Sequence, residues 1–255
     1  MKQIETENEF WDYGEEIYPS QSVIEGYLGQ LVHLFSPGRT VADLGCGRGE
    51  FLDVMRENGH HAIGVDLSSH SRDIVTRKGF PFYQVDIIEF IETSPWTYDG
   101  LFSYGLLEHL DANTISKLFR VMGQHCRSGT EAVFATHNPS SIQALTRPLF
   151  SELTHERLYS PELLEFLFES NGFEIRKVGS LVQQQKLVSD QALTVDENKR
   201  FIADLNKMRE NGKSVNGQRQ IEYLAGRVNV IELVLTEIVQ LLNVPMDYFV
   251  FATKK

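Results

Sequence analysis

VADLGCGRG, residues 41–49, sets the interpretation of this 255-residue chain. An apolar run over 40–44 carries an aspartate, Asp43, and glycines then occupy every second position before a helix predicted from Glu50. Glycines permit positive φ angles and let a backbone approach a ligand closely. Ligands of open α/β sheets bind at the carboxyl ends of the strands. The stretch therefore predicts a strand, a ligand-binding loop and a helix in succession.

Predicted strands and helices alternate with short links on both sides of this loop. Apolar runs predict strands, and apolar residues at helical spacing predict helices. The expected strands cover 40–44, 61–65, 82–85, 101–104, 131–136, 173–178 and 246–253, and the expected helices cover 20–35, 50–58, 68–78, 112–126 and 160–171. The last of these helices starts with Ser160-Pro161-Glu162, a capping hydroxyl followed by proline and an acid. Alternation of this kind favours a parallel sheet with helices on both faces.

About seventy residues separate the last two expected strands. A helix is predicted over 196–210, and a longer one over 218–243 carries apolar residues in alternating steps of three and four. Two interpretations stay open for this stripe: one side of an antiparallel helical hairpin, or the interface of a homodimer. The predicted organisation is an N-terminal helical segment over 1–37, a main domain over 38–182 and 246–255, and a helical insertion over 183–245.

Composition narrows the class of protein. The net charge of −11 disfavours a nucleic-acid substrate, because neutralising phosphates needs lysine and arginine. Two cysteines cannot make a disulfide framework and fit a reducing compartment, so a cytoplasmic location is expected. The sequence contains no uninterrupted apolar run of about 18 residues, so no membrane-spanning helix is expected. The acidic N-terminus has no apolar core of a signal peptide, so none is expected there.

Aspartates end three successive predicted strands. Asp43 precedes the first glycine by two positions and suits a ligand with an ammonium group. Asp66 follows Gly45 by 21 residues, where a carboxylate can accept from both hydroxyls of a ribose. Asp86 could accept from an adenine amino group, with Ile87 packing on the ring. The alternative is that Asp66 and Asp86 only cap the following helices.

At these residues the chain resembles class I S-adenosylmethionine-dependent methyltransferases. The resemblance is carried by DLGCGRG, by GVDLS over 64–68, by VD at 85–86 and by SYGLLEHL over 103–110. It implies a Rossmann-like α/β fold: a seven-stranded, mostly parallel sheet in the order 3-2-1-4-5-7-6, with helices on both faces and a helical insertion before the last strand. It also implies S-adenosylmethionine as cofactor and S-adenosylhomocysteine as product. The cofactor-binding residues it implies are Asp43, Gly45, Cys46, Gly47, Gly49, Asp66, Leu67, Asp86, Ile87 and Tyr104.

A narrower resemblance concerns the second half of the domain. HNP over 137–139, LTHER over 153–157 and SPELLEFL over 160–167 are similar to bacterial methyltransferases from polysaccharide and O-antigen gene clusters. It implies methylation of an oxygen of a sugar, a sugar phosphate or a related small metabolite, and hence a small-molecule or glycan acceptor. The chain departs from that pattern at His137, where a proline or threonine is usual, and over 157–159.

Two other functions stay open. One is a quinone- or phenol-type O-methyltransferase, which an aromatic pocket without arginine would favour. The other is a cofactor-binding assembly protein without turnover, acting through the helix over 218–243. An anionic acceptor could be held by arginine, and the candidates are Arg39, Arg48 and Arg147. The alternative is that these side chains are solvated or paired with acids.

The catalytic candidates are histidines. Methyl transfer from a sulfonium is an in-line displacement, in which the protein aligns the reactants and removes an acceptor proton where needed. His109, after the fourth predicted strand, and His155, before the capped helix, are the predicted general bases, while His137 is a weaker candidate. His109 could instead only fix its loop. Trp11, Tyr13 and Tyr18 could cover the cofactor.

Glu108, His109 and His155 raise the alternative of a metal site, because their side chains are common ligands. Small-RNA 2′-O-methyltransferases of similar outline use such ligands, together with an upstream glutamate and a further histidine. Gly105 or Leu106 stands where that glutamate would be, and no H-x-x-H pair is present. The sequence therefore predicts no metal site.

Overall fold

The computed structural model describes residues 20–94, 97–141, 144, 154–181 and 244–255. The chain divides into two compact units, Met1–Val182 with Pro245–Lys255, and Gln183–Val244. Apart from Val244, every described residue belongs to the first unit. The predicted insertion helices with their apolar stripe, the aromatic residues before the first helix, and Arg147 lie outside the described residues.

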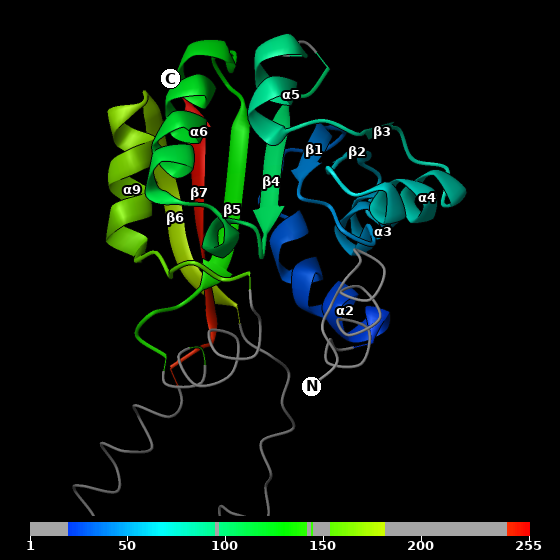
Figure 1. Cartoon of the computed structure of the whole chain (residues 1–255), viewed down its shortest axis with the longest axis horizontal. Helices are drawn as coiled ribbons and strands as arrows, with labels where there is room; N and C mark the ends of the chain where they lie inside the picture. Colours follow the sequence, from blue (N-terminus) through cyan, green and yellow to red (C-terminus); the bar gives the residue numbers. More distant parts are fainter. Residues whose placement is uncertain (1–19, 95–96, 142–143, 145–153, 182–243) are drawn as a thin grey trace, which may run out of the picture. The chain divides into compact units, whose positions relative to one another are not determined.

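The first unit is built on one seven-stranded sheet in the order β3-β2-β1-β4-β5-β7-β6 (Figure 1). The strands are β1 (Thr40–Leu44), β2 (His61–Val65), β3 (Phe82–Tyr83), β4 (Gly100–Tyr104), β5 (Glu131–His137), β6 (Phe173–Leu181) and β7 (Asp247–Lys254). The first five pair in parallel, and β7 runs antiparallel to both β5 and β6. The predicted strand order is confirmed.

Helices pack on both faces of the sheet and enclose two hydrophobic cores. The helices are α2 (Gln21–Val32), α3 (Glu50–Glu57), α4 (Ser69–Arg77), α5 (Ile87–Thr93), α6 (Ala112–His125) and α9 (Pro161–Ser170), with a 3₁₀ turn η1 (Leu107–His109). One core joins residues of α5, α6 and α9 to the sheet, and the other joins residues of α2, α3 and α4 to it. The Rossmann-like architecture is therefore confirmed.

Local signals explain the helix starts. Ser160 caps α9 by accepting from the Leu163 backbone N–H, and Pro161 follows at the first helical position, as the sequence predicts. Asp111 caps α6 in the same manner, by accepting from the backbone N–H groups of Asn113 and Thr114. Each cap satisfies donors that the helix itself leaves unpaired.

Helix α5 is absent from the sequence prediction, which has only a strand over 82–85 in this region. The structure ends β3 at Tyr83 and starts α5 at Ile87, after Asp86 as its cap. The four buried residues of this seven-residue helix are Ile87, Ile88, Phe90 and Ile91. So short an apolar run shows no clear helical period, and that is why the pattern did not predict a helix.

The sheet brings distant residues to one edge. The parallel strands β1, β4 and β5 all end there, and β7 begins there because it runs the opposite way (Figure 1). In the β5–β7 register His137 pairs with Asp247 and Thr136 with Tyr248. The glycine loop after β1 and the residues after β4 therefore share this edge with the start of β7.

Candidate active site

The loop after β1 has the backbone that its glycines predict. Gly45, Gly47 and Gly49 have φ angles of 73°, 50° and 78°, a region that side-chain-bearing residues avoid. The backbone N–H groups of Gly45 and Cys46 donate to the Val65 carbonyl of β2. The loop is therefore fixed to the neighbouring strand, with its backbone open to a ligand.

Asp66 holds the glycine loop in place. Its Oδ2 accepts from the Gly47 N–H at 3.0 Å, and its Oδ1 accepts from the Ser68 N–H at 2.8 Å. Ser68, and not Asp66, caps helix α4, because the Ser68 hydroxyl accepts from the His70 and Ser71 backbones. Asp66 therefore does not cap α4, contrary to the alternative raised from the sequence.

Asp86 does cap a helix. Its Oδ1 accepts from the backbone N–H groups of Ile88 and Glu89 at the start of α5. The cap interpretation, raised as an alternative, therefore holds for one oxygen of this carboxylate. Beside these strand ends, Leu67 is 67% exposed and Ile87 is buried. The predicted contact of Asp86 and these two side chains with adenine stays a prediction.

A pocket of about 390 Å³ opens above the glycine loop. One wall is acidic and carries Asp43, Glu50 and Asp66 beside the loop glycines. The other wall is apolar and aromatic, and is lined by Ile24, Leu28, Phe51, Phe102, Tyr104 and Leu106. His109 and Thr154 line the pocket as well. Arg48 also reaches it, but its Nε lies 2.6 Å from Glu50 Oε1 in an ion pair.

Asp43 sits at the base of the acidic wall and is only 4% exposed. Burial raises the pKa of this carboxyl well above its usual range, and the nearby negative charges of Glu50 and Asp66 raise it further. The acidic side chains gathered around Asp43 make the pocket a favourable environment for a positively charged ligand. A cofactor with an ammonium and a sulfonium meets this requirement.

Cys46 packs beneath the loop. Its side chain is buried, and its Sγ would lie 2.9 Å from a Cβ placed on Gly64 of β2. Burial raises the pKa of the Cys46 thiol, with smaller contributions from Asp43 and Asp66. The thiol therefore stays protonated and contributes to packing, and Cys46 is one of the residues that line the pocket.

A buried hydrogen-bond network lies behind the aromatic wall. The hydroxyls of Tyr27 and Tyr104 both donate to Asp247 Oδ2, at 2.7 Å and 3.1 Å. Asp247 is fully buried. Its Oδ1 lies 2.6 Å from Nδ1 of His137. The sequence predicted Tyr104 as a cofactor contact but missed Tyr27 and Asp247, because nothing local marks their pairing across the sheet.

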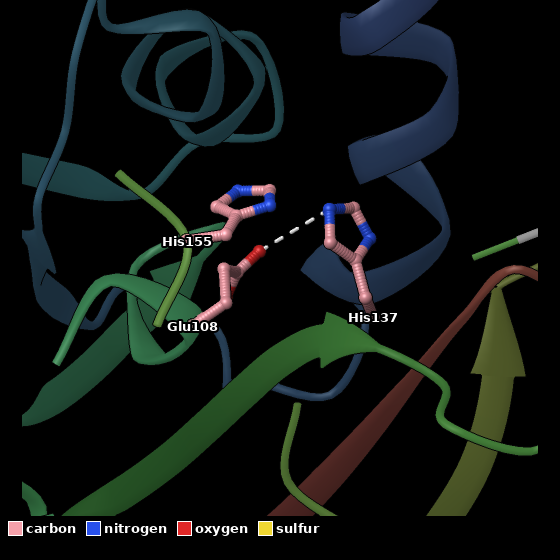
Figure 2. A group of neighbouring side chains, drawn as sticks. All are labelled: Glu108, His137 and His155. Atoms are coloured by element: carbon pink, nitrogen blue, oxygen red, sulfur yellow. Dashed lines mark ion pairs between the residues drawn. The ribbon is translucent and has the colours of Figure 1, made fainter. Parts of the chain in front are cut away.

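Three residues from separate parts of the chain meet next to His109 and Thr154, which line the pocket: Glu108 of η1, His137 at the end of β5, and His155. Figure 2 shows Glu108, His137 and His155 facing one another. Nε2 of His137 lies 3.3 Å from Glu108 Oε1, and the Thr136 hydroxyl donates to Glu108 Oε2 at 2.7 Å. The backbone N–H groups of Glu156 and Arg157 donate to the Glu108 carbonyl and fix the segment that carries His155.

The two predicted catalytic histidines lie together. The rings of His109 and His155 meet edge to face, with centroids 4.6 Å apart. Nδ1 of His109 lies 2.9 Å from the Thr154 hydroxyl oxygen. His109 is the one that lines the pocket, beside the apolar wall. The ring of His137, the weaker candidate, is 5.6 Å from that of His155.

Arg39 lies at the opposite end of the sheet from the pocket. It precedes β1, and its guanidinium is 3.4 Å from Glu131 and 3.9 Å from Asp99 in ion pairs. Arg39 is therefore a paired side chain, the alternative raised from the sequence, and it lies far from the carboxyl ends of the strands.

The strand order, the glycine loop and the acidic pocket together define a class I S-adenosylmethionine-dependent methyltransferase. A family model described as a methyltransferase domain matches residues 21–178, and the chain belongs to that family. The class predicted from the sequence motifs is confirmed.

Curated relatives and a solved structure resemble the chain. It is 26% identical over 161 residues to the human mitochondrial ubiquinone biosynthesis O-methyltransferase, and the alignment covers 55% of this chain and 43% of that protein. It is 29% identical over 114 residues to the ubiquinone biosynthesis O-methyltransferase of Paracidovorax citrulli, and the alignment covers 42% of this chain and 48% of that protein. The chain therefore spans about half the length of these relatives.

The fold is shared with a crystal structure of an S-adenosylmethionine-dependent methyltransferase from Archaeoglobus fulgidus. The TM-score is 0.70 at 23% identity, and the match covers 96% of this chain and 99% of that chain. Among the described residues, no helix has the length and apolar character needed to cross a membrane.

Proposed function

We propose that this chain transfers the methyl group of S-adenosylmethionine to a hydroxyl of a phenol- or quinol-type small molecule. The observation that carries the proposal is the set of apolar and aromatic residues that line the pocket together with the acidic ones. The named relatives, which are ubiquinone biosynthesis O-methyltransferases, support the same substrate class.

The pocket favours an aromatic acceptor over a sugar. Ile24, Tyr104 and Leu106 are the partly exposed apolar or aromatic residues of the lining. Burial of an aromatic ring against them is favourable by about 25 cal/mol per Å² of apolar area. A sugar would bring several hydroxyls against the same wall, and buried hydroxyls without partners are costly. The sugar acceptor inferred from the narrower resemblance gains no support from the named relatives, so the phenolic acceptor takes its place.

The charges around the pocket favour an acceptor without a phosphate or carboxylate. Arg48 is paired with Glu50, and Arg39 lies at the far end of the sheet. Asp43, Glu50 and Asp66 would repel an anion. Among the described residues that line the pocket, no arginine is left to bind an anionic group.

The cofactor supplies an activated methyl group on a sulfonium, and the chain's own residues would hold it. Asp43 would accept from the ammonium, Asp66 would accept from the ribose hydroxyls, and the backbone of the glycine loop would hold the amino-acid portion. Asp86, through the oxygen that does not cap α5, would accept from the adenine amino group, with Leu67 and Ile87 as the proposed contacts of the ring.

His109 is the proposed general base. It lines the pocket next to the apolar wall, and Thr154 fixes its ring through the contact with Nδ1. Its Nε2 can then take the proton of the acceptor hydroxyl as methyl transfer proceeds. His155 supports His109 by ring contact.

We expect cofactor affinity to fall as the pH is lowered from neutrality towards the ordinary carboxyl range. The pKa of Asp43 is raised by burial in the free protein, so its ionisation is costly, and stability linked to this group is lost as the pH rises through that pKa. The cofactor ammonium requires the ionised form, and binding therefore releases a proton. Calorimetry with S-adenosylhomocysteine in two buffers of different ionisation enthalpy measures that release.

Asp43→Asn is the matched variant for this prediction. It should bind the cofactor more weakly at neutral pH and lose both the proton release and the pH dependence. An affinity of the wild type that does not change with pH, with no proton released, would contradict a role for Asp43 in binding the ammonium.

The substrate class is tested by methyl transfer to a panel of acceptors. The panel contains an alkylated catechol, a dihydroxybenzoate, a nucleotide-activated sugar and a free sugar, each incubated with the protein and S-adenosylmethionine. Mass spectrometry should find a methyl ether on the catechol and none on the sugars. Methylation of the sugars without the catechol would overturn the proposal.

A further inference from the structure

We infer that Glu108, His137 and His155 form a binding site for one divalent transition-metal ion such as Zn²⁺. The inferred site lies beside His109 and Thr154, at the edge of the pocket, and it does not depend on the identity of the methyl acceptor. The sequence predicted no metal site because the upstream glutamate and the H-x-x-H pair of the small-RNA methyltransferases are missing, and it considered His109, not His137, beside Glu108. The structure instead brings His137 of β5 to Glu108.

The first observation is the geometry of the ligand atoms. One carboxylate oxygen and two ring nitrogens all lie within 4.8 Å of one another (Figure 2). Ligands about 2.0–2.2 Å from a tetrahedral ion are about 3.3–3.6 Å apart, and Nε2 of His137 and Oε1 of Glu108 are 3.3 Å apart. The third ligand would be a ring nitrogen of His155, which is partly exposed and lies within 4.8 Å of the other two ligand atoms.

The second observation is an unsatisfied carboxylate oxygen. The Glu108 side chain is 1% exposed, and its Oε2 accepts from Thr136. Its Oε1 forms no hydrogen bond with any described residue, although it is buried. An unsatisfied buried acceptor costs about 1–3 kcal/mol, and more when it is charged. That oxygen is directed at the two histidines, where a cation would satisfy it.

The third observation is the partner of His137. Asp247 accepts from Nδ1 of His137 at 2.6 Å, and two tyrosine hydroxyls hold Asp247 in place. With the proton on Nδ1, the lone pair of Nε2 points towards Glu108 Oε1 and would repel it. Metal-binding histidines characteristically donate their other ring N–H to a carboxylate in this manner, and the carboxylate fixes the ring and its tautomer.

The charge balance favours a divalent ion over a proton. Glu108 and Asp247 are both fully buried, and among the described residues the only ion-pair partner of either is His137. An extra proton on His137 would leave one negative charge uncompensated, whereas a divalent ion with neutral histidines would cancel both. Two imidazoles and one carboxylate suit Zn²⁺ and similar ions better than Mg²⁺ or Ca²⁺, which prefer oxygen ligands.

The test is zinc binding by the untagged full-length protein after chelator treatment. Competition with a chromophoric chelator gives affinity and stoichiometry, and Co²⁺ substitution reports the ligand geometry by visible absorption. We expect one Zn²⁺ per chain. His155→Ala and Glu108→Gln should weaken binding by at least about 100-fold, and Asp247→Asn by about 10- to 100-fold.

The matched control is His61→Ala, since His61 is exposed at the amino-terminal end of β2, away from the site. This variant should bind zinc as the wild type does. S-Adenosylhomocysteine binding and the thermal unfolding midpoint, measured for each variant, separate lost ligands from lost folding.

Two results would overturn the metal site: no zinc uptake by the wild type, or equal affinity in wild type and folded His155→Ala. A protonated His137 in place of the ion would give the first result. Cofactor binding and methyl transfer by the same protein would then show that the proposed function stands without the metal. Zinc uptake without methyl transfer would uphold the site and count against the proposed function alone.

Discussion

Asp66→Ala is expected to weaken binding of S-adenosylmethionine and S-adenosylhomocysteine by at least about 100-fold. The change removes the carboxylate proposed to accept from the two ribose hydroxyls, and each hydrogen bond to a charged group contributes about 1.5–3 kcal/mol. It also removes the bond that holds the Gly47 N–H at 3.0 Å, so the glycine loop loses its support. Calorimetry with each cofactor measures the loss.

The control for this prediction is Asp73→Ala. Asp73 lies on helix α4, its side chain is 61% exposed, and it pairs with Arg72 on the surface. Because surface ion pairs contribute little, this variant should bind the cofactor as the wild type does. An Asp66→Ala protein that is folded and binds the cofactor within about threefold of the wild type would rule out the proposed ribose contact.

His109→Ala is expected to lower kcat for a phenolic acceptor by about 10²- to 10⁴-fold, the usual contribution of a general base. The affinity for S-adenosylhomocysteine should change little, because the base acts on the acceptor and not on the cofactor. Single-turnover and steady-state rates with the same acceptor, beside calorimetry, separate these two effects.

The pH profile distinguishes a base from a residue that only fixes its loop. A phenol loses its proton in water at a pH of about 10, so the deficit of His109→Ala should shrink as the pH approaches that value. Thr154→Ala, which removes the partner of His109 Nδ1, should cause a smaller loss. A deficit of the same size at every pH would assign His109 a structural role in its loop.

The fold was predictable where local signals agree. Gly45, Gly47 and Gly49 mark the turn after β1 by their position, and Ser160-Pro161 marks the start of α9 by its capping chemistry. Helix α5 was not predictable in the same way. Its seven residues are too few to show a helical period, and the structure forms it because Asp86 caps it and four of its residues are buried.

The candidate site was predictable where its residues follow strand ends. Parallel strands place their carboxyl ends at one edge, so Asp43, Asp66 and His109 could be assigned to one region from the sequence. Asp247 could not, because its contact with His137 depends on the antiparallel pairing of β5 and β7, 110 positions apart in the sequence. The contact of Glu108 with His137 could not be predicted either, because it depends on the pairing of β4 with β5 in the sheet.

A crystal structure of the chain with S-adenosylhomocysteine is the most direct test of the proposed cofactor site and its acidic wall. We expect both ribose hydroxyls within hydrogen-bonding distance of the Asp66 carboxylate and the amino group of the nucleoside's amino-acid portion facing Asp43 above the glycine loop. A nucleoside bound elsewhere on the protein, or lying in the pocket with its ribose away from Asp66, would contradict the assignment.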